Sequence, residues 1–99
     1  MASQVSLSVN DVPINLDYFV SEYMEHVVAG IVGSLRDTGE IESLELSIGN
    51  DGEVKIYLNK ADVPIKYFPN EIIRSTILGM VSTLKGVDKV ERLQITIGR

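Results

Sequence analysis

The single histidine, His26, lies four residues after Glu22 and directly after Glu25 in the sequence. A histidine beside carboxylates could bind a metal ion or act as an acid–base couple. Zinc sites need three or four protein ligands, commonly several histidines or cysteines, and this chain has no cysteine and no second histidine. We therefore interpret His26 as a solvated helical histidine and predict no metal site.

Two short segments resemble binding loops but lack the residues that would complete them. Asn50-Asp51-Gly52-Glu53 has the composition of a calcium loop, but the remaining ligands of that roughly twelve-residue loop are missing. Gly30-Ile31-Val32-Gly33 is not followed by the Gly-Lys-Ser/Thr of a phosphate loop. No serine, histidine and acid are spaced in an interpretable catalytic set. The sequence therefore predicts a hairpin turn at Asn50–Glu53, and no catalytic, cofactor-binding or metal-binding residue.

Several acidic and aromatic residues recur in pairs, and each pair has a structural explanation. Tyr18-Phe19 and Tyr67-Phe68 stand where two predicted helices begin, and we expect them to be core aromatics wedged between helix and sheet, not a stacking platform. Glu22 and Glu71 fall near helix starts, where the positive end of the helix dipole favours acids. Glu42 and Glu91 fall near strand starts, and we expect all four glutamates to be solvated.

Composition indicates one globular domain and excludes several function classes. The 99 residues are 44% apolar and 23% charged, and nine basic against fourteen acidic residues give 9 − 14 = −5. This acidity argues against nucleic acid, whose binding starts from clustered lysines and arginines. The longest apolar run, Val27–Gly33, is too short to span a membrane. The start at Met1–Gln4 has no signal-peptide character. With no cysteine, these features predict a cytoplasmic protein.

The chain reads as two copies of one unit, about residues 1–49 and 50–99, within the single domain 1–99. A shift of 49 aligns the copies without a gap, and similar apolar pairs such as Leu7/Ile56 and Val28/Ile77 support the alignment. We interpret the pattern as a tandem duplication. The identical pairs are Val5/Val54, Asn10/Asn59, Tyr18/Tyr67, Phe19/Phe68, Glu22/Glu71, Gly30/Gly79, Val32/Val81, Leu35/Leu84, Glu42/Glu91, Leu44/Leu93, Ile48/Ile97 and Gly49/Gly98.

Each copy predicts a hairpin with a short second arm. In copy one the turn Asn10-Asp11 sets Val9 opposite Val12, Leu7 opposite Ile14 and Val5 opposite Leu16. The sequence Asp-Val-Pro-Ile recurs at a shift of 51, so copy two is expected to have a longer turn, Asn59–Asp62. That turn would set Leu58 opposite Val63, Ile56 opposite Ile65 and Val54 opposite Tyr67. Pro13 and Pro64 confine the second arms to edges or short pieces.

Helices are predicted at Tyr18–Arg36 and Phe68–Lys85, ended by Asp37–Gly39 and Gly86–Asp88. Strands are predicted at Ile41–Ile48 and Val90–Ile97, where alternation turns the apolar residues toward one side. The inward residues are Leu44, Leu46, Ile48, Leu93, Ile95 and Ile97; the outward residues are Glu45, Ser47, Gln94 and Thr96.

These elements predict an α+β fold, a two-layer sandwich with two helices on one face of a sheet. Without the short arms the order is βαββαβ, which resembles the ferredoxin-like fold. If the arms are full strands, each unit is ββαβ and the sheet becomes more antiparallel. The uncovered face would carry Ser6, Ser8, Glu45, Ser47, Lys55, Tyr57, Gln94 and Thr96. RNA-recognition domains carry several aromatics there, whereas one is expected here, so this face is either solvated or paired with a second subunit.

The helices are apolar over more than half of their circumference, which is wider than a surface helix needs. A partner subunit would explain the excess; packing between the two helices is the alternative. Gly30 and Gly79 occupy matching mid-helix positions, each followed four residues later by Ser34 or Thr83. Because a mid-helix glycine costs about 1 kcal/mol relative to alanine, we expect a packing reason: the small residues let the helix backbones approach closely, and the two glycines face each other across the pseudo-twofold axis that relates the copies. Inheritance from the ancestral half is the alternative.

Three function classes remain. The first is a non-catalytic assembly or protein-interaction module that forms a homo-oligomer, with a protein partner also possible. The second is a small-molecule-binding regulatory domain, because the βαββαβ order resembles ligand-binding ACT domains. Their first loop usually carries an Asp followed by a Gly; here Asn10–Ile14 has Asp11 but no glycine. The third is an enzyme whose site forms between subunits, and the absence of catalytic motifs argues against it.

Overall fold

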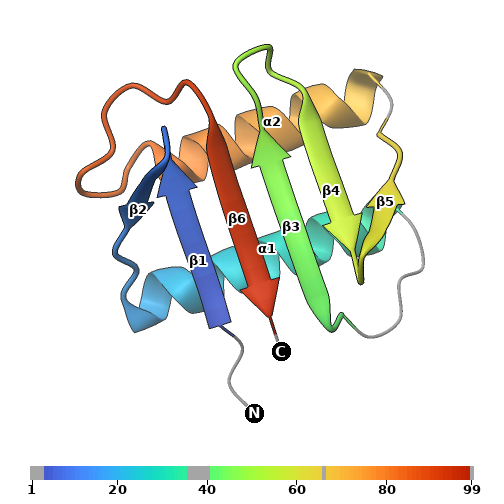
Figure 1. Cartoon of the computed structure of the whole chain (residues 1–99), viewed down its shortest axis with the longest axis horizontal. Coiled ribbons are helices and arrows are strands. Elements are labelled where there is room, and N and C mark those ends of the chain that lie inside the picture. The colour runs from blue at the N-terminus through green and yellow to red at the C-terminus, as the bar shows by residue number, and fades with distance from the viewer. Residues whose placement is uncertain (1–3, 36–40, 66, 99) are drawn as a thin grey trace.

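The computed structural model describes residues 4–35, 41–65 and 67–98, with the backbone alone for Tyr67 and Phe68. Eight elements follow one another along the chain, and Figure 1 shows them from the open side of the sheet. They are β1 (Gln4–Val9), β2 (Val12–Ile14), α1 (Tyr18–Leu35), β3 (Ser43–Ile48), β4 (Val54–Leu58), β5 (Ala61–Val63), α2 (Tyr67–Val81) and β6 (Leu93–Gly98).

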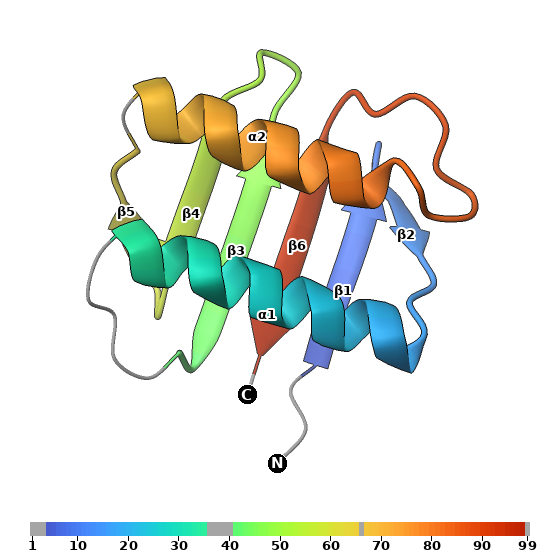
Figure 2. The ribbon, with the colours of Figure 1, turned by 180° about the vertical axis from the view of Figure 1, so that it is seen from behind.

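The six strands form one sheet in the order β2-β1-β6-β3-β4-β5, and every neighbouring pair is antiparallel. Both helices lie on the same face of this sheet and run antiparallel to each other (Figure 2). The predicted α+β class and the cover on one side are therefore correct. The short arms are strands, as the second alternative required, and both lie at sheet edges. Pro13 lies within β2, where an edge position leaves it without need of a further ladder partner, whereas Pro64 directly follows the end of β5.

The strand order differs from the ferredoxin-like arrangement. There the first strand of each βαβ unit lies at the centre of the sheet, whereas here the last strands, β3 and β6, are central. Leu46 pairs with Ile95 in the middle of this seam, and both side chains are fully buried. The resemblance is thus limited to the order of elements along the chain.

The core fills the space between the sheet and the helices. Its members are the inward residues of the four long strands and one stripe of each helix, together with Val63 of β5 and Ile41, which precedes β3. The alternation in β3 and β6 matches the prediction: Leu44, Leu46 and Ile48 are buried, as are Leu93, Ile95 and Ile97. The helices contribute Met24, Val28, Val32, Ile73, Ile77 and Val81.

The expected longer turn in the second hairpin is wrong. Leu58 pairs with Ala61 and Ile56 with Val63, so the turn is the two-residue Asn59-Lys60. In the first hairpin the turn is Asn10-Asp11, and Val9 pairs with Val12 and Leu7 with Ile14, as predicted. All four turn residues have positive φ, between 49° and 69°, which is the geometry of a tight hairpin turn. The Asp-Val-Pro-Ile of the second copy therefore lies two residues further from its hairpin turn than that of the first copy.

Helix α2 ends at Val81, four residues before the predicted end at Lys85. The hydroxyls of Ser82 and Thr83 donate hydrogen bonds to the carbonyls of Gly79 and Met80, and such bonds compete with the helical ladder. The predicted stop of α1 at Asp37–Gly39 lies outside the described residues. At its start, the Oδ1 atom of Asp17 accepts a hydrogen bond from the Val20 amide at 2.8 Å, which is the geometry of a helix cap.

Two asparagines join the halves of the chain reciprocally. The Oδ1 atom of Asn10 accepts hydrogen bonds from the amides of Glu91 and Arg92, at 2.8 and 3.0 Å. The Oδ1 atom of Asn59 accepts bonds from the amides of Glu42 and Ser43, at 2.8 and 3.1 Å. The first hairpin turn of each half therefore binds the segment that leads into the central strand of the other half. We call this pair of asparagines the asparagine clamp.

Replacing Asn59 by glycine should destabilise the fold, because glycine keeps the positive φ but removes the acceptor of two backbone amides. We expect the free energy of unfolding to fall by about 1–3 kcal/mol, measured by urea denaturation. Asn59→Ala should cost a further ~1 kcal/mol or more for the left-handed backbone. Lys60→Gly is the matched control in the same turn and should not destabilise. Wild-type stability in Asn59→Gly would contradict the role of the clamp.

Candidate functional site

The residues with potential for metal or acid–base chemistry do not gather in one place. Within the described part of the chain, no group of three or more His, Asp or Glu side chains could hold a metal ion. His26 is exposed on α1, whereas Glu25 is buried with 7% of its surface accessible. Glu42 and Glu91 are exposed beside the asparagine clamp. These positions offer no visible catalytic arrangement.

The segment Asn50–Glu53 is a hairpin turn, as predicted. The Gly52 amide donates to the Gly49 carbonyl at 2.9 Å, and the Glu53 amide donates to Asp51 Oδ1 at 3.0 Å. Gly52 has a φ of 80°, a conformation that glycine adopts without strain. The Asp51 carboxylate is thus occupied in closing the turn.

The expectation that Tyr18 and Phe19 are core aromatics is wrong. Their exposed fractions are 81% and 70%, and the side chains of Tyr67 and Phe68 lie outside the described residues. Phe19 instead stacks on Tyr23, with ring centroids 5.8 Å apart. Tyr23 and Ile72 are each 51% exposed on the same helical layer. The core is filled by aliphatic side chains and Met24, so these aromatics are left on the outer surface.

Two apolar grooves lie between α1 and α2 on the side facing away from the sheet. The first has a volume of about 470 Å³ and lies between the second half of α1 and the first half of α2. The second, of about 390 Å³, lies between the first half of α1 and the second half of α2. We call them groove A, lined by Val27, Gly30, Ile31, Ser34, Leu35, Pro69, Ile72 and Ile73, and groove B, lined by Phe19, Val20, Tyr23, Val27, Thr76, Gly79, Met80, Thr83 and Leu84.

The grooves correspond to each other, and neither is lined by a charged residue. Moving 49 positions along the chain takes Gly30 and Ser34 of groove A to Gly79 and Thr83 of groove B. The same shift relates Tyr23 of groove B to Ile72 of groove A. The surface between the helices is therefore apolar, uncharged and present twice.

The hypothesis that Gly30 and Gly79 face each other across the pseudo-twofold axis relating the copies is wrong. Both residues are exposed, and a methyl group placed on either Cα would meet no atom within 4 Å outside its immediate helical surroundings. The close approach inferred from the matching glycines does not occur within the chain. Each glycine instead lines one groove, where the absence of a side chain makes the wall of the groove low.

A separate polar hollow of about 560 Å³ opens at the end of the sheet face where β3 turns into β4. Its charged lining residues are Asp11, Asp51, Glu53, Lys55 and Arg92. Asp11 forms an ion pair with Arg92, which lowers the pKa of the Asp11 carboxyl and raises the pKa of the guanidinium. The hollow could admit a small polar molecule, but histidine is not among its described lining residues.

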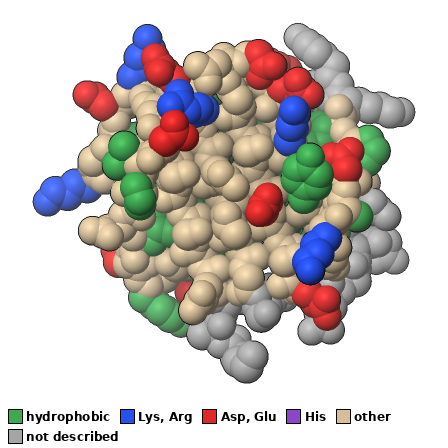
Figure 3. Space-filling view, in the orientation of Figure 1, with side chains coloured by type: hydrophobic (Ala, Val, Ile, Leu, Met, Phe, Trp, Pro, Cys, Tyr) green, Lys and Arg blue, Asp and Glu red, His purple; other side chains and the backbone are tan. Residues whose placement is uncertain are grey.

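The rest of the open sheet face is polar, as predicted, and none of its eight expected outward residues is buried. Figure 3 shows that uncharged polar side chains and backbone cover most of its middle. Tyr57, the aromatic residue predicted there, is 44% exposed. The face lacks the aromatic and basic pattern of an RNA-binding sheet.

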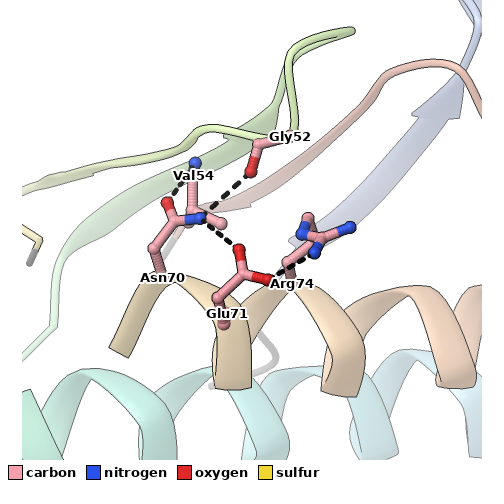
Figure 4. Close-up of polar contacts among 5 residues, drawn as sticks. All are labelled: Gly52, Val54, Asn70, Glu71 and Arg74. Carbon is pink, nitrogen blue, oxygen red and sulfur yellow. Dashed lines mark hydrogen bonds and ion pairs between the residues drawn. The ribbon is translucent and has the colours of Figure 1, made fainter. Parts of the chain in front are cut away.

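Helix α2 is tied to the β3–β4 turn by Asn70, as Figure 4 shows. Its side chain accepts a hydrogen bond from the Val54 amide at 2.7 Å and donates to the Gly52 carbonyl at 3.1 Å. Glu71, expected to be solvated, accepts a bond from Arg74 at 2.6 Å, which lowers the pKa of its carboxyl. These contacts fix the start of α2 over the sheet, and we assign them a structural role.

Sequence reasoning did not find the grooves, although it singled out some of the residues that line them. The available signal was the matching spacing of Gly30 and Ser34 with Gly79 and Thr83. Phe19 and Tyr23, on the same helix as His26, were a second signal, because the core does not contain them. Interpreting these residues as an exposed surface, and not as a contact between the two helices, would have located the grooves.

Comparisons of the chain with family models, curated proteins and solved structures give no match. Neither described helix has the length and apolar character needed to cross a membrane.

Gly30→Ala and Gly79→Ala should each stabilise the protein. Because both positions are exposed in the single chain, with open space around the missing Cβ, alanine would raise the free energy of unfolding of the monomer by about 0.5–1 kcal/mol, measured by urea denaturation at a protein concentration low enough to keep the chain monomeric. Gly52→Ala is the contrasting variant: it should destabilise, because φ is positive there and a Cβ would lie 3.4 Å from the Arg74 side chain. Destabilisation by both helical alanines would restore the close-contact hypothesis.

Proposed function

We propose that this protein is a non-catalytic assembly module that forms a homo-oligomer through the outer face of its helical layer. One observation carries the proposal: two corresponding, uncharged apolar grooves lie on that face beside the exposed side chains of Phe19, Tyr23 and Ile72. Contiguous exposed apolar surface of this kind is typical of interaction sites.

The energetics favour covering this face. Apolar surface removed from water contributes roughly 25 cal/mol per Å², so a contact that buries these side chains gains several kcal/mol before the costs of association. Because the groove linings carry no charge, filling the grooves does not require desolvating a charged lining side chain. The opposite sheet face has neither property, since its exposed residues are mostly polar.

We further propose that the two halves of the chain descend from one duplicated ββαβ unit. The pairing of Leu46 with Ile95, 49 residues on, supports this, as do the reciprocal bonds of Asn10 and Asn59 and the correspondence of the two grooves. A duplicated half would bring its own copy of an interaction surface. The outer helical face would then present the same surface twice, related by the internal symmetry of the chain.

The second candidate is a small-molecule-binding regulatory domain. The polar hollow lined by Asp11, Lys55 and Arg92 favours it, because these groups could hold a small charged metabolite. The hollow lies on the opposite side of the sheet from the grooves, so the two candidate functions involve separate surfaces.

A lysine at position 23 should dissociate the oligomer. Tyr23 is half exposed in the isolated chain, so Tyr23→Lys should fold normally, whereas an unpaired charge in an apolar interface costs about 3 kcal/mol or more. We expect light scattering with size-exclusion chromatography to give a multiple of the 10.9 kDa chain mass for the wild type. The variant should associate roughly 100-fold more weakly.

Tyr57→Lys is the matched control, because Tyr57 is exposed to a similar extent on the open sheet face. It should leave the mass unchanged, and circular dichroism should show that both variants are folded. A monomeric wild type at several hundred micromolar would contradict the proposal. So would dissociation caused by Tyr57→Lys but not by Tyr23→Lys. A thermal shift with metabolites in a monomeric wild type would favour the small-molecule candidate.

A further inference from the structure

Each helix carries its bulky outward side chains in its first half and small ones in its second. On α1, the exposed Phe19 and Tyr23 are followed by Gly30 and Ser34. On α2, the exposed Ile72 is followed by Gly79, and Thr83 lies two residues beyond the end of the helix. The outer helical face therefore has raised regions and low regions in a regular arrangement.

Because the helices are antiparallel (Figure 2), the raised half of one lies beside the low half of the other. Groove A runs between Ile72 and the low wall at Gly30 and Ser34. Groove B runs between Phe19 and Tyr23 on one side and Gly79 and Thr83 on the other. One face thus carries both protrusions and the recesses that could receive them.

We propose that a second copy of this chain occupies both grooves in a twofold dimer, in which the raised half of each helix seats on the low half of the partner's other helix. This rests on the proposed function, which it deepens by naming the partner and the pairing. A twofold axis lying in the interface parallel to the helices brings the first half of α1 over the second half of the partner's α2. The first half of α2 then covers the second half of the partner's α1.

The protrusions and recesses of the outer helical face explain why the partner is another copy of this chain. An isologous contact requires a surface complementary to itself, and a face with matched protrusions and recesses meets that requirement. Each chain carries a net charge of −5, which disfavours self-association in general, but no charged residue lines either groove.

The size of the face is also sufficient. The molecule measures 35 by 34 Å across and 18 Å in depth. Covering two thirds of that area would bury about 800 Å² per protomer, which is the size of a standard specific interface. The dimer would then consist of two outer sheets enclosing a double layer of helices.

Disulfide mapping tests the pairing, and the chain has no native cysteine to interfere. Two separately tagged preparations, Ile72→Cys and either Gly30→Cys or Ser34→Cys, are mixed, equilibrated and mildly oxidised. We expect the mixed disulfide to exceed each self-disulfide by roughly tenfold, because cysteines whose Cα atoms are more than about 7 Å apart cannot be bridged. Ser6→Cys mixed with Ser47→Cys, on the open sheet face, is the control and should give little product.

The outcomes separate this inference from the proposed function. A dimer that Tyr23→Lys dissociates, but whose disulfides form mainly between two Ile72→Cys chains, retains the helical interface and overturns this pairing. Cross-linking mainly through the Ser6→Cys and Ser47→Cys pair would place the interface on the sheet and overturn both. A monomeric wild type would also overturn both.

Discussion

The structure depends on the asparagine clamp, in which each half of the chain satisfies backbone amides of the other. Asn10 holds the residues that lead into β6, and Asn59 holds those that lead into β3. Both asparagines adopt positive φ in two-residue turns, so the side chain that turns the hairpin also aligns the neighbouring strand. With β6 beside β1 and β3 beside β4, the two central strands meet in the seam that buries Leu46 and Ile95.

This arrangement determines where the helices lie and what they expose. Each helix connects strands on the same side, so both cover one face and the other stays open and polar. The core requires one stripe of each helix, through residues such as Val28 and Ile77. The apolar residues left over, Phe19, Tyr23 and Ile72 among them, therefore face outward around two grooves. We propose that a second copy of the chain covers them.

The sequence alone predicts much of the fold because apolar alternation and helical periodicity depend on local burial. The inward residues of β3 and β6 follow from such patterns, and the edge position of the arm that contains Pro13 follows from its proline. The turn at Asn59-Lys60 did not, because a repeated Asp-Val-Pro-Ile suggested another register and the positive φ values leave no periodic signal. The outer grooves were missed for a similar reason: sequence shows that Phe19 and Gly30 recur in the second copy, but not which way they point.

The central claim is that the outer helical face is buried against a second copy of itself. Isotope-filtered NMR on a mixture of labelled and unlabelled chains observes contacts between protomers directly. The proposed twofold dimer predicts intermolecular nuclear Overhauser effects from the rings of Phe19 and Tyr23 to Gly79 and Thr83, with none to Ser6 or Thr96. Intermolecular effects confined to the open sheet face, or none at millimolar concentration, would contradict it.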